Sequence, residues 1–378
     1  MKIMLIEDSQ PKRDAIKSFL VACGVVDSDI VCAANMTDFS ANLHHDIGLF
    51  IVDFYIPVLD GGSASQNGRA ILETINKSEK KDALVIAISS YPDDFLGLRD
   101  YYEARGCVLV DYSKKDAWQS ALRILLVQLR RNMRMDFLIF CALQEERSPY
   151  VALLQGKLQI RGGVDCLDVV IGGRSGLVVL MPQMGLVNAA VIAGLCIDRY
   201  MPSVVGMSGI CGGFSSRAKL GQLFVCSMAY EYQSGKWSGD GFKQEPYQCA
   251  TDHMTLTKLR ALVNQPGLMG ELESGFTGVR PSSASPPDLG VFTSGSAVIA
   301  DRSHLTSIEQ IHRKVSALDM EVFALHRAAE ISCARPACIS AKTVVDLCDA
   351  EKVDDLHSYG SFISARFLIK AIANHFEA

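Results

Sequence analysis

The sequence predicts an α/β protein made of two units that follow one another along the chain. In the first 130 or so residues, apolar segments alternate with helical patterns, and the clearest of these segments are KIMLIED (2–8), IGLFIVDF (47–54), ALVIAISS (83–90) and CVLVDYSK (107–114). A second series begins at MDFLIFCALQEE (135–146) and runs to PACISAKTVVD (336–346). Strands that alternate with helices favour βαβ units around a parallel sheet.

The length of 378 residues also favours more than one domain. We expect a doubly wound, parallel-sheet domain over residues 1–126, a helical connector over 127–135 and a second α/β domain over 136–378. Helical stretches such as 187–200 and 318–332 lie between the strands of the second domain.

Composition narrows the class of protein. The hydrophobic content of 49% fits globular domains with substantial cores, and a net charge of −5 does not suggest a nucleic-acid-binding surface. No stretch approaches the ~20 apolar residues of a membrane span. The twelve cysteines form no Cys-x-x-Cys pair, and about nine lie in apolar runs, as reduced core cysteines do. These features favour a soluble, cytoplasmic protein without a structural metal site, membrane segment or nucleic-acid partner.

Polar residues end each clear strand of the first unit. Glu7 and Asp8 close the first strand, Asp53 a central one, Ser89 the next, and Lys114 or Lys115 the last. The carboxyl ends of parallel strands are where ligands bind in open sheets. Carboxylates that converge there repel one another, and Mg²⁺ relieves that repulsion with oxygen coordination.

This set, with the loop DFYIPVLDGG after the central strand, resembles the receiver domain of two-component response regulators. The resemblance implies that Asp53 accepts a phosphoryl group from a sensor histidine kinase, and that Glu7, Asp8 and Asp53 hold Mg²⁺. Ser89 would contact the phosphoryl oxygens and Lys114, or its neighbour Lys115, would pair with them. Two departures are that no proline follows the lysine, and that the loop GGSASQNG (61–68) is longer than usual.

In the second unit, acidic residues and glycines lie at strand ends. Glu146 ends the first strand-turn, the glycines of MSGICGG (207–213) permit close approach of a ligand, and Asp346 ends CISAKTVVD. The stretch SALDMEVFALHRAAE (316–330) has a helical pattern that places Glu321 on the apolar face. Asp319, His326 and Glu330 fall on the opposite face, which we expect to be solvated.

Six segments in order resemble the nucleoside phosphorylase superfamily, and within it the branch that hydrolyses methylthioadenosine and S-adenosylhomocysteine. They are ALQEE, MGLVNAA, SGICGGF with KLGQLFV, SGSAVI, LDMEVFAL and VVDLCD. The resemblance implies a general acid at Asp346, water activation by Glu146, ribose binding by Glu321 and packing of Met320 against the sugar. Backbone groups near Ile210, Cys211 and Gly212 would line the pocket, and no cofactor is expected there.

Three departures bear on the substrate. Val345 stands where the branch has a serine, Val298 replaces a base-side aromatic residue, and Lys342 replaces an arginine. We keep Val298 and Lys342 as substrate-side residues. Basic residues in candidate strand-end loops could meet a charged 5′ group; they are Arg174, Arg217, Lys219, Arg302 and His304.

The pairing of the two domains resembles the effectors of Detocs two-component phage-defence systems. That resemblance implies a phosphorylation-controlled nucleosidase that splits ATP into adenine and ribose 5-triphosphate, acting as a homo-oligomer. A methylthioadenosine-type nucleosidase and a phosphate-dependent phosphorylase remain alternatives. A non-catalytic nucleotide sensor is an alternative of another class.

Overall fold

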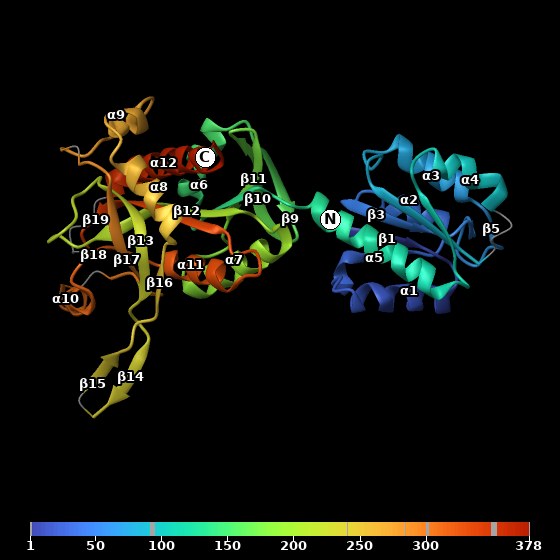
Figure 1. Cartoon of the computed structure of the whole chain (residues 1–378), viewed down its shortest axis with the longest axis horizontal. Coiled ribbons are helices and arrows are strands. Elements are labelled where there is room, and N and C mark those ends of the chain that lie inside the picture. The colour runs from blue at the N-terminus through green and yellow to red at the C-terminus, as the bar shows by residue number, and fades with distance from the viewer. Residues whose placement is uncertain are drawn as a thin grey trace. The chain divides into compact units, whose positions relative to one another are not determined.

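The computed structural model of the chain describes residues 2–90, 95–239, 241–283, 285–299, 302–348 and 354–377. The chain divides into two compact units, Met1–Met133 and Arg134–Ala378, each with its own sheet and core (Figure 1).

Five parallel strands form the sheet of the first unit, in the order β2-β1-β3-β6-β7. This is the flavodoxin-like order, in which ligands bind outside the carboxyl ends of the strands where the order reverses. That position lies between β1 and β3, which are followed directly by Glu7 and Asp53. The strands are β1 (Lys2–Ile6), β2 (Ile30–Ala33), β3 (Ile47–Val52), β6 (Leu84–Ser89) and β7 (Val108–Asp111), with a small hairpin of β4 (Tyr55–Ile56) and β5 (Ser65–Gln66).

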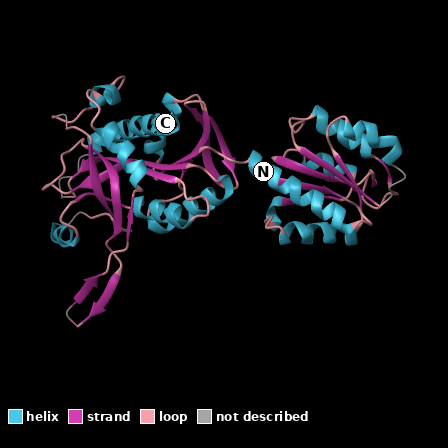
Figure 2. Ribbon diagram, in the orientation of Figure 1, coloured by secondary structure: helices cyan, strands magenta, loops and turns pink. Residues whose placement is uncertain are grey.

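Helices cover both faces of this sheet because successive strand residues point to opposite faces. In β3, Leu49 and Ile51 pack against α1 and α5, whereas Phe50 and Val52 pack against α2, α3 and α4. Figure 2 shows the helices on both faces of this sheet. The helices are α1 (Gln10–Ala22), α2 (Met36–Asn42), α3 (Gly68–Lys77), α4 (Phe95–Glu103) and α5 (Lys115–Asn132).

The second unit is built on a ten-stranded mixed sheet, in the order β16-β13-β17-β18-β12-β8-β11-β10-β9, with β19 paired to β12 and β13. Its strands are β8 (Phe137–Cys141), β9 (Lys157–Arg161), β10 (Val164–Ile171), β11 (Arg174–Leu180), β12 (Val204–Gly213), β13 (Leu223–Glu231), β16 (Gln248–Ala250), β17 (Asp288–Ser294), β18 (Val315–Asp319) and β19 (Ala337–Asp346). A separate hairpin, β14 (Gly235–Ser238) and β15 (Gly241–Gln244), extends away from the body of this unit (Figure 1).

Register brings the functional segments together. Parallel pairing of β12 with β19 sets Gly209 opposite Lys342 and Gly212 opposite Asp346. Gly212 also pairs with Leu318 of β18, so the carboxyl ends of β12, β18 and β19 meet at one edge of the sheet.

Two layers of helices sandwich the second sheet. Helices α7 and α11 pack on one face, and α6, α8, α9 and α12 contribute to the core on the other. The helices of this unit are α6 (Gln144–Leu153), α7 (Leu186–Tyr200), α8 (His253–Val263), α9 (Leu268–Glu273), α10 (Arg302–Ile311), α11 (Val322–Ile331) and α12 (His357–Glu377).

The α/β fold class is confirmed, and each of the four clear strand segments of the first unit contains a strand of its sheet. Residues 127–132 of the expected connector continue α5 without a break. Nine of the twelve cysteines are buried, and all twelve are free thiols. None of the described helices combines the length and apolar character of a membrane span.

The predicted helix over 316–330 is wrong in its first part. Val315–Asp319 forms a strand, because these residues pair with β17 on one side and β12 on the other. Glu321 is therefore the N-cap of α11 and does not lie on a helix face. Asp319 and His326, expected on a solvated face, are 6% and 3% exposed.

Candidate active site

A cavity of about 240 Å³ lies where the strands of the second unit end. The structure brings together in its lining all nine residues predicted for this site, from segments that follow or end β8, β12, β17, β18 and β19. They are Glu146, Ile210, Cys211, Gly212, Val298, Met320, Glu321, Lys342 and Asp346. Their chemical roles remain predictions.

Glu146 is the third residue of α6 and is 2% exposed. Its Oε2 atom accepts the N–H groups of Ala142 at 2.8 Å and Leu143 at 3.1 Å, and its Oε1 atom accepts the N–H of Ile210 at 3.0 Å. A carboxylate offers about four acceptor positions, so roughly one remains for a water in the cavity. Burial raises the pKa of Glu146, whereas the nearby Lys342 opposes this rise.

Glycine at position 209 makes room for this carboxylate. A Cβ atom there would collide with Oε1 and Cδ of Glu146, and the backbone has φ +156°. Gly212 likewise makes room for Cys348 and Asp346. A Cβ atom at position 212 would collide with the Sγ atom of Cys348 and lie 3.2 Å from Oδ1 of Asp346. At Gly209 and Gly212 of MSGICGG, the groups that approach the backbone closely are therefore side chains of the protein itself, and close approach of a ligand remains a prediction.

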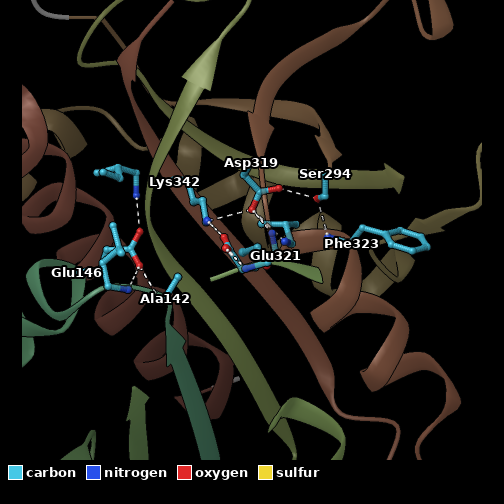
Figure 3. A network of polar contacts seen from close by, with 12 residues as sticks. Ala142, Glu146, Ser294, Asp319, Glu321, Phe323 and Lys342 are labelled. Atoms are coloured by element: carbon cyan, nitrogen blue, oxygen red, sulfur yellow. Dashed lines mark hydrogen bonds and ion pairs between the residues drawn. The ribbon is translucent and has the colours of Figure 1, made fainter. Parts of the chain in front are cut away.

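A buried lysine, Lys342, links the carboxylates of Asp319 and Glu321 (Figure 3). The Nζ atom of Lys342 lies 2.9 Å from Oδ2 of Asp319 and 2.9 Å from Oε2 of Glu321. The second oxygen of Glu321 accepts the N–H of Gly185 at 2.9 Å. Burial alone would lower the pKa of Lys342, but Asp319, Glu321 and Glu146 together raise it well above its usual range. The two carboxylates in contact with Lys342 therefore favour its charged form.

Asp319 holds the start of α11 as well as the lysine. Its Oδ2 atom accepts the N–H groups of Glu321 at 3.2 Å and Val322 at 2.9 Å, and its Oδ1 atom accepts the hydroxyl of Ser294 at 2.6 Å. Carboxylates that accept from the first N–H groups of a helix are favoured by those unpaired donors and by the helix dipole. Asp319 thereby fixes the backbone that carries Met320 and Glu321.

Asp346 ends β19 half-buried, and its Oδ1 atom accepts the N–H of Cys348 at 2.8 Å. Met320 and Ile210 are also half-buried in the lining, whereas Val298 is 63% exposed. The carboxyl group of Asp346 therefore lines the cavity next to Val345, an apolar residue that is buried.

Three residues of the site were not predicted from the sequence. Asp319 and His357 line the cavity, and Gly185 donates its N–H to Glu321. The sequence contains one indication that Asp319 is buried in the site. Lys342 lies inside the apolar strand CISAKTVVD, and a buried lysine needs carboxylate partners. His357 gave no such signal; its Nδ1 atom lies 3.0 Å from Oε1 of Glu145.

The basic residues considered for a charged 5′ group are not in the described lining of the cavity. Arg174 begins β11, at the end of the strand opposite to the cavity, and stacks on the ring of Phe376. The side chain of Arg302 falls outside the described residues.

The first unit has a polar cluster at the carboxyl ends of β1, β3 and β6. Glu7, Asp8 and Asp53 each offer an oxygen within 4.8 Å of the others. Ser89 is buried at the end of β6. Lys114 and Lys115 are exposed at the start of α5.

A different lysine contacts Asp53. The Nζ atom of Lys12 lies 2.7 Å from Oδ2 of Asp53 and 2.8 Å from Oε2 of Glu7, and the Lys12 side chain is 3% exposed. Burial raises the pKa of Glu7 to about 7 against the opposing effect of Lys12. The carboxylates are of the kind that Mg²⁺ prefers, but an ammonium group already lies against the oxygens that the ion would use. The residues therefore do not accommodate Mg²⁺ in this arrangement.

Comparison with known proteins agrees with the second unit's geometry. The family model described as "Phosphorylase superfamily" matches residues 136–365. The chain belongs to the phosphorylase superfamily. The match includes Glu146, Glu321 and Asp346, and the second unit is an enzyme domain of this superfamily with the fold of known nucleosidases.

Solved structures of this superfamily share the fold at low sequence identity. Methylthioadenosine/S-adenosylhomocysteine nucleosidase of Neisseria meningitidis is 16% identical, with a TM-score of 0.52, and the match covers 63% of this chain and 98% of that one. Futalosine hydrolase of Helicobacter pylori is 18% identical, with a TM-score of 0.52, covering 65% and 99%.

Two relatives differ in what they share with the chain. Protein y4jS of Sinorhizobium fredii is 26% identical over 418 aligned positions, which cover 98% of each chain and hence both units. The ATP nucleosidase Cap17 of Escherichia coli strain KTE188 is 24% identical over 206 positions, covering 51% of this chain but only 40% of Cap17.

Proposed function

We propose that the second unit hydrolyses the N-glycosidic bond of adenine nucleotides, with ATP as the substrate and adenine and ribose 5-triphosphate as products. The observation that carries this proposal is the meeting of Glu146, Glu321 and Asp346 in one cavity of a nucleosidase-type fold. The resemblance to Cap17, whose name describes an ATP nucleosidase, supports ATP among the adenine nucleotides.

In the proposed reaction, Glu321 and Met320 bind the ribose, with Glu321 accepting hydrogen bonds from its 2′- and 3′-hydroxyls. Lys342 and the N–H of Gly185 hold the Glu321 carboxylate in place. Because both groups donate to this carboxylate before substrate arrives, little reorganisation is needed on binding.

Cleavage gives the sugar oxocarbenium-ion character while negative charge develops on the purine. Asp346 shares a proton with purine N7 and so relieves that charge. Glu146 accepts a proton from a water, which adds to the anomeric carbon as the C–N bond breaks. Burial favours this role, because the raised pKa makes Glu146 a stronger base than an exposed glutamate.

We further propose that the first unit controls this activity, with Asp53 as acceptor of a phosphoryl group from a sensor histidine kinase. The flavodoxin-like strand order and the position of Asp53 beyond β3 support the resemblance to receiver domains. The resemblance implies Ser89 and Lys114 or Lys115 as supporting residues, and Mg²⁺ as a cofactor, whose binding would require Lys12 to leave the oxygens of Glu7 and Asp53. Anti-phage defence is the setting that the resemblance to Detocs effectors suggests, and a homo-oligomer is the expected assembly.

The test measures free adenine after incubation with ATP, AMP, adenosine or methylthioadenosine, each with and without inorganic phosphate and acetyl phosphate. Adenine from ATP in the absence of phosphate supports the proposal. Adenine only from the thioether nucleoside, or only with phosphate, would instead support the methylthioadenosine-type nucleosidase or the phosphorylase. Nucleotide binding without adenine under any condition would indicate a sensor. Asp53→Asn should remove stimulation by acetyl phosphate while unstimulated cleavage persists.

A further inference from the structure

The polar cluster of the first unit already contains its own cation. Lys12 is almost fully buried, and its ammonium group has three oxygen partners: Glu7 Oε2 at 2.8 Å, Asp53 Oδ2 at 2.7 Å and the carbonyl of Ile88 at 2.8 Å. The ammonium nitrogen also lies 5.3 Å from the centroid of the Tyr112 ring, a cation–π arrangement. Lys12 is therefore held from several sides, unlike a surface lysine that happens to approach an acidic group.

The position of Lys12 in helix α1 is electrostatically unfavourable. Lys12 lies in the first turn of α1, where the helix dipole and the unpaired N–H groups disfavour a positive charge. Side chains of a helix point back towards its N-terminus, which here faces the carboxylates after β1 and β3. The attraction of Glu7 and Asp53 thus outweighs an unfavourable helix position.

The four carboxylate oxygens of Glu7 and Asp53 all have partners within the protein. Lys12 occupies one oxygen of each, Ser9 donates its N–H to Glu7 Oε1 at 3.0 Å, and Phe54 donates its N–H to Asp53 Oδ1 at 2.7 Å. Mg²⁺ needs oxygens at about 2.0–2.1 Å in octahedral geometry. An ammonium group 2.7–2.8 Å from two of these oxygens excludes such an ion from the same position.

We propose that Lys12 is an internal counter-ion that competes with divalent cations for the site formed by Glu7, Asp8 and Asp53. The ammonium group then offsets part of the negative charge of the three carboxylates and covers one oxygen each of Glu7 and Asp53, so the site binds Mg²⁺ weakly. Loss of the ammonium group turns the same carboxylates into a divalent-cation site. Competition between Lys12 and divalent cations requires neither nucleosidase activity nor phosphorylation.

The test is Mg²⁺ binding by the chelator-treated, nucleotide-free full chain, followed by isothermal titration calorimetry and by thermal unfolding. Lys12→Met should bind Mg²⁺ at least about tenfold more tightly than the wild type. Its Tm should be lowered without Mg²⁺ and restored by it, because a ligand that binds only the folded state stabilises that state. Adding Asp53→Asn to Lys12→Met should abolish the gain.

Lys17→Met is the matched control, since Lys17 lies on the same helix but is 34% exposed and pairs with Asp27. It should behave as the wild type. The proposal is overturned if the wild type binds Mg²⁺ as tightly as Lys12→Met. It is also overturned if neither Lys12→Met nor Lys12→Gln folds in millimolar Mg²⁺, because the ion would then be unable to replace the ammonium group.

Discussion

The ammonium nitrogen of Lys342 lies 2.9 Å from Oε2 of Glu321, and the two side chains are 2% and 4% exposed. The same nitrogen contacts Asp319, so one lysine serves two buried carboxylates. Removing the lysine leaves two unpaired buried charges, whereas removing Glu321 leaves Lys342 with Asp319. Loss of Lys342 should therefore destabilise the protein more than loss of Glu321.

Lys342→Met should destabilise the protein by about 3–5 kcal/mol, because breaking a buried ion pair leaves uncompensated charge. The free energy of unfolding from urea titration measures this. Lys370→Met is the control: Lys370 pairs with the partly exposed Glu271 and its loss should cost less than about 1 kcal/mol. Equal effects of the two substitutions would contradict the role given to Lys342.

Glu321→Gln should leave the fold intact and weaken substrate binding and cleavage, because the amide binds ribose hydroxyls less well than a carboxylate. We expect a loss of about tenfold to a hundredfold in kcat/KM, the worth of one or two charged hydrogen bonds. Circular dichroism and steady-state kinetics separate the two effects. A variant that unfolds, or one with wild-type kcat/KM, would show that Glu321 serves the structure alone.

Gly209→Ala should reduce cleavage, because the added Cβ collides with the Glu146 carboxylate and displaces it. Gly194→Ala is the matched control, since a Cβ there meets nothing within 4 Å and the residue lies within α7. The control should keep full activity and gain about 0.5–1 kcal/mol of stability. Full activity in Gly209→Ala would mean that the position of Glu146 does not matter to the reaction.

The pH dependence of kcat/KM should report Glu146. Water activation needs the ionised carboxylate, and burial raises its pKa above the usual 4.5, so activity should fall as the pH drops through a midpoint above 4.5. Lys342 opposes that rise, so Lys342→Gln should move the midpoint to higher pH and Lys342→Arg should leave it in place. A midpoint at or below 4.5, or one unmoved by Lys342→Gln, would contradict this assignment.

Sequence patterns predicted the strands well, since each apolar segment is bounded by turns and ends in a polar residue. They failed at residues 315–319, where pairing with β17 and β12 overrides a helical pattern. Glu321 was predicted to lie on an apolar helix face, yet it occupies the N-cap position of α11. Its buried carboxylate contacts Lys342 and the N–H of Gly185.

The residues of the candidate site were easier to predict than the hydrogen bonds and ion pairs between them. Family resemblance selected nine residues that meet in the cavity, because strand ends that follow one another in a sheet also meet in space. The Asp319–Lys342 and Lys12–Asp53 pairs join residues 23 and 41 positions apart. Such pairs depend on the register of the strands and on the direction of a long side chain, and a local sequence pattern predicts neither of these.

Hydrolysis of ATP by the second unit is tested by measuring adenine release in phosphate-free buffer from the wild type and from Asp346→Asn. Asp198→Asn, an exposed substitution on α7, serves as the control. The wild type and the control should each release adenine and ribose 5-triphosphate in equal amounts. Loss of a general acid should slow Asp346→Asn by about 10²–10⁴-fold while nucleotide binding persists. Near-normal turnover in Asp346→Asn, or no adenine from ATP with the wild type under any phosphorylation condition, would contradict the proposed reaction.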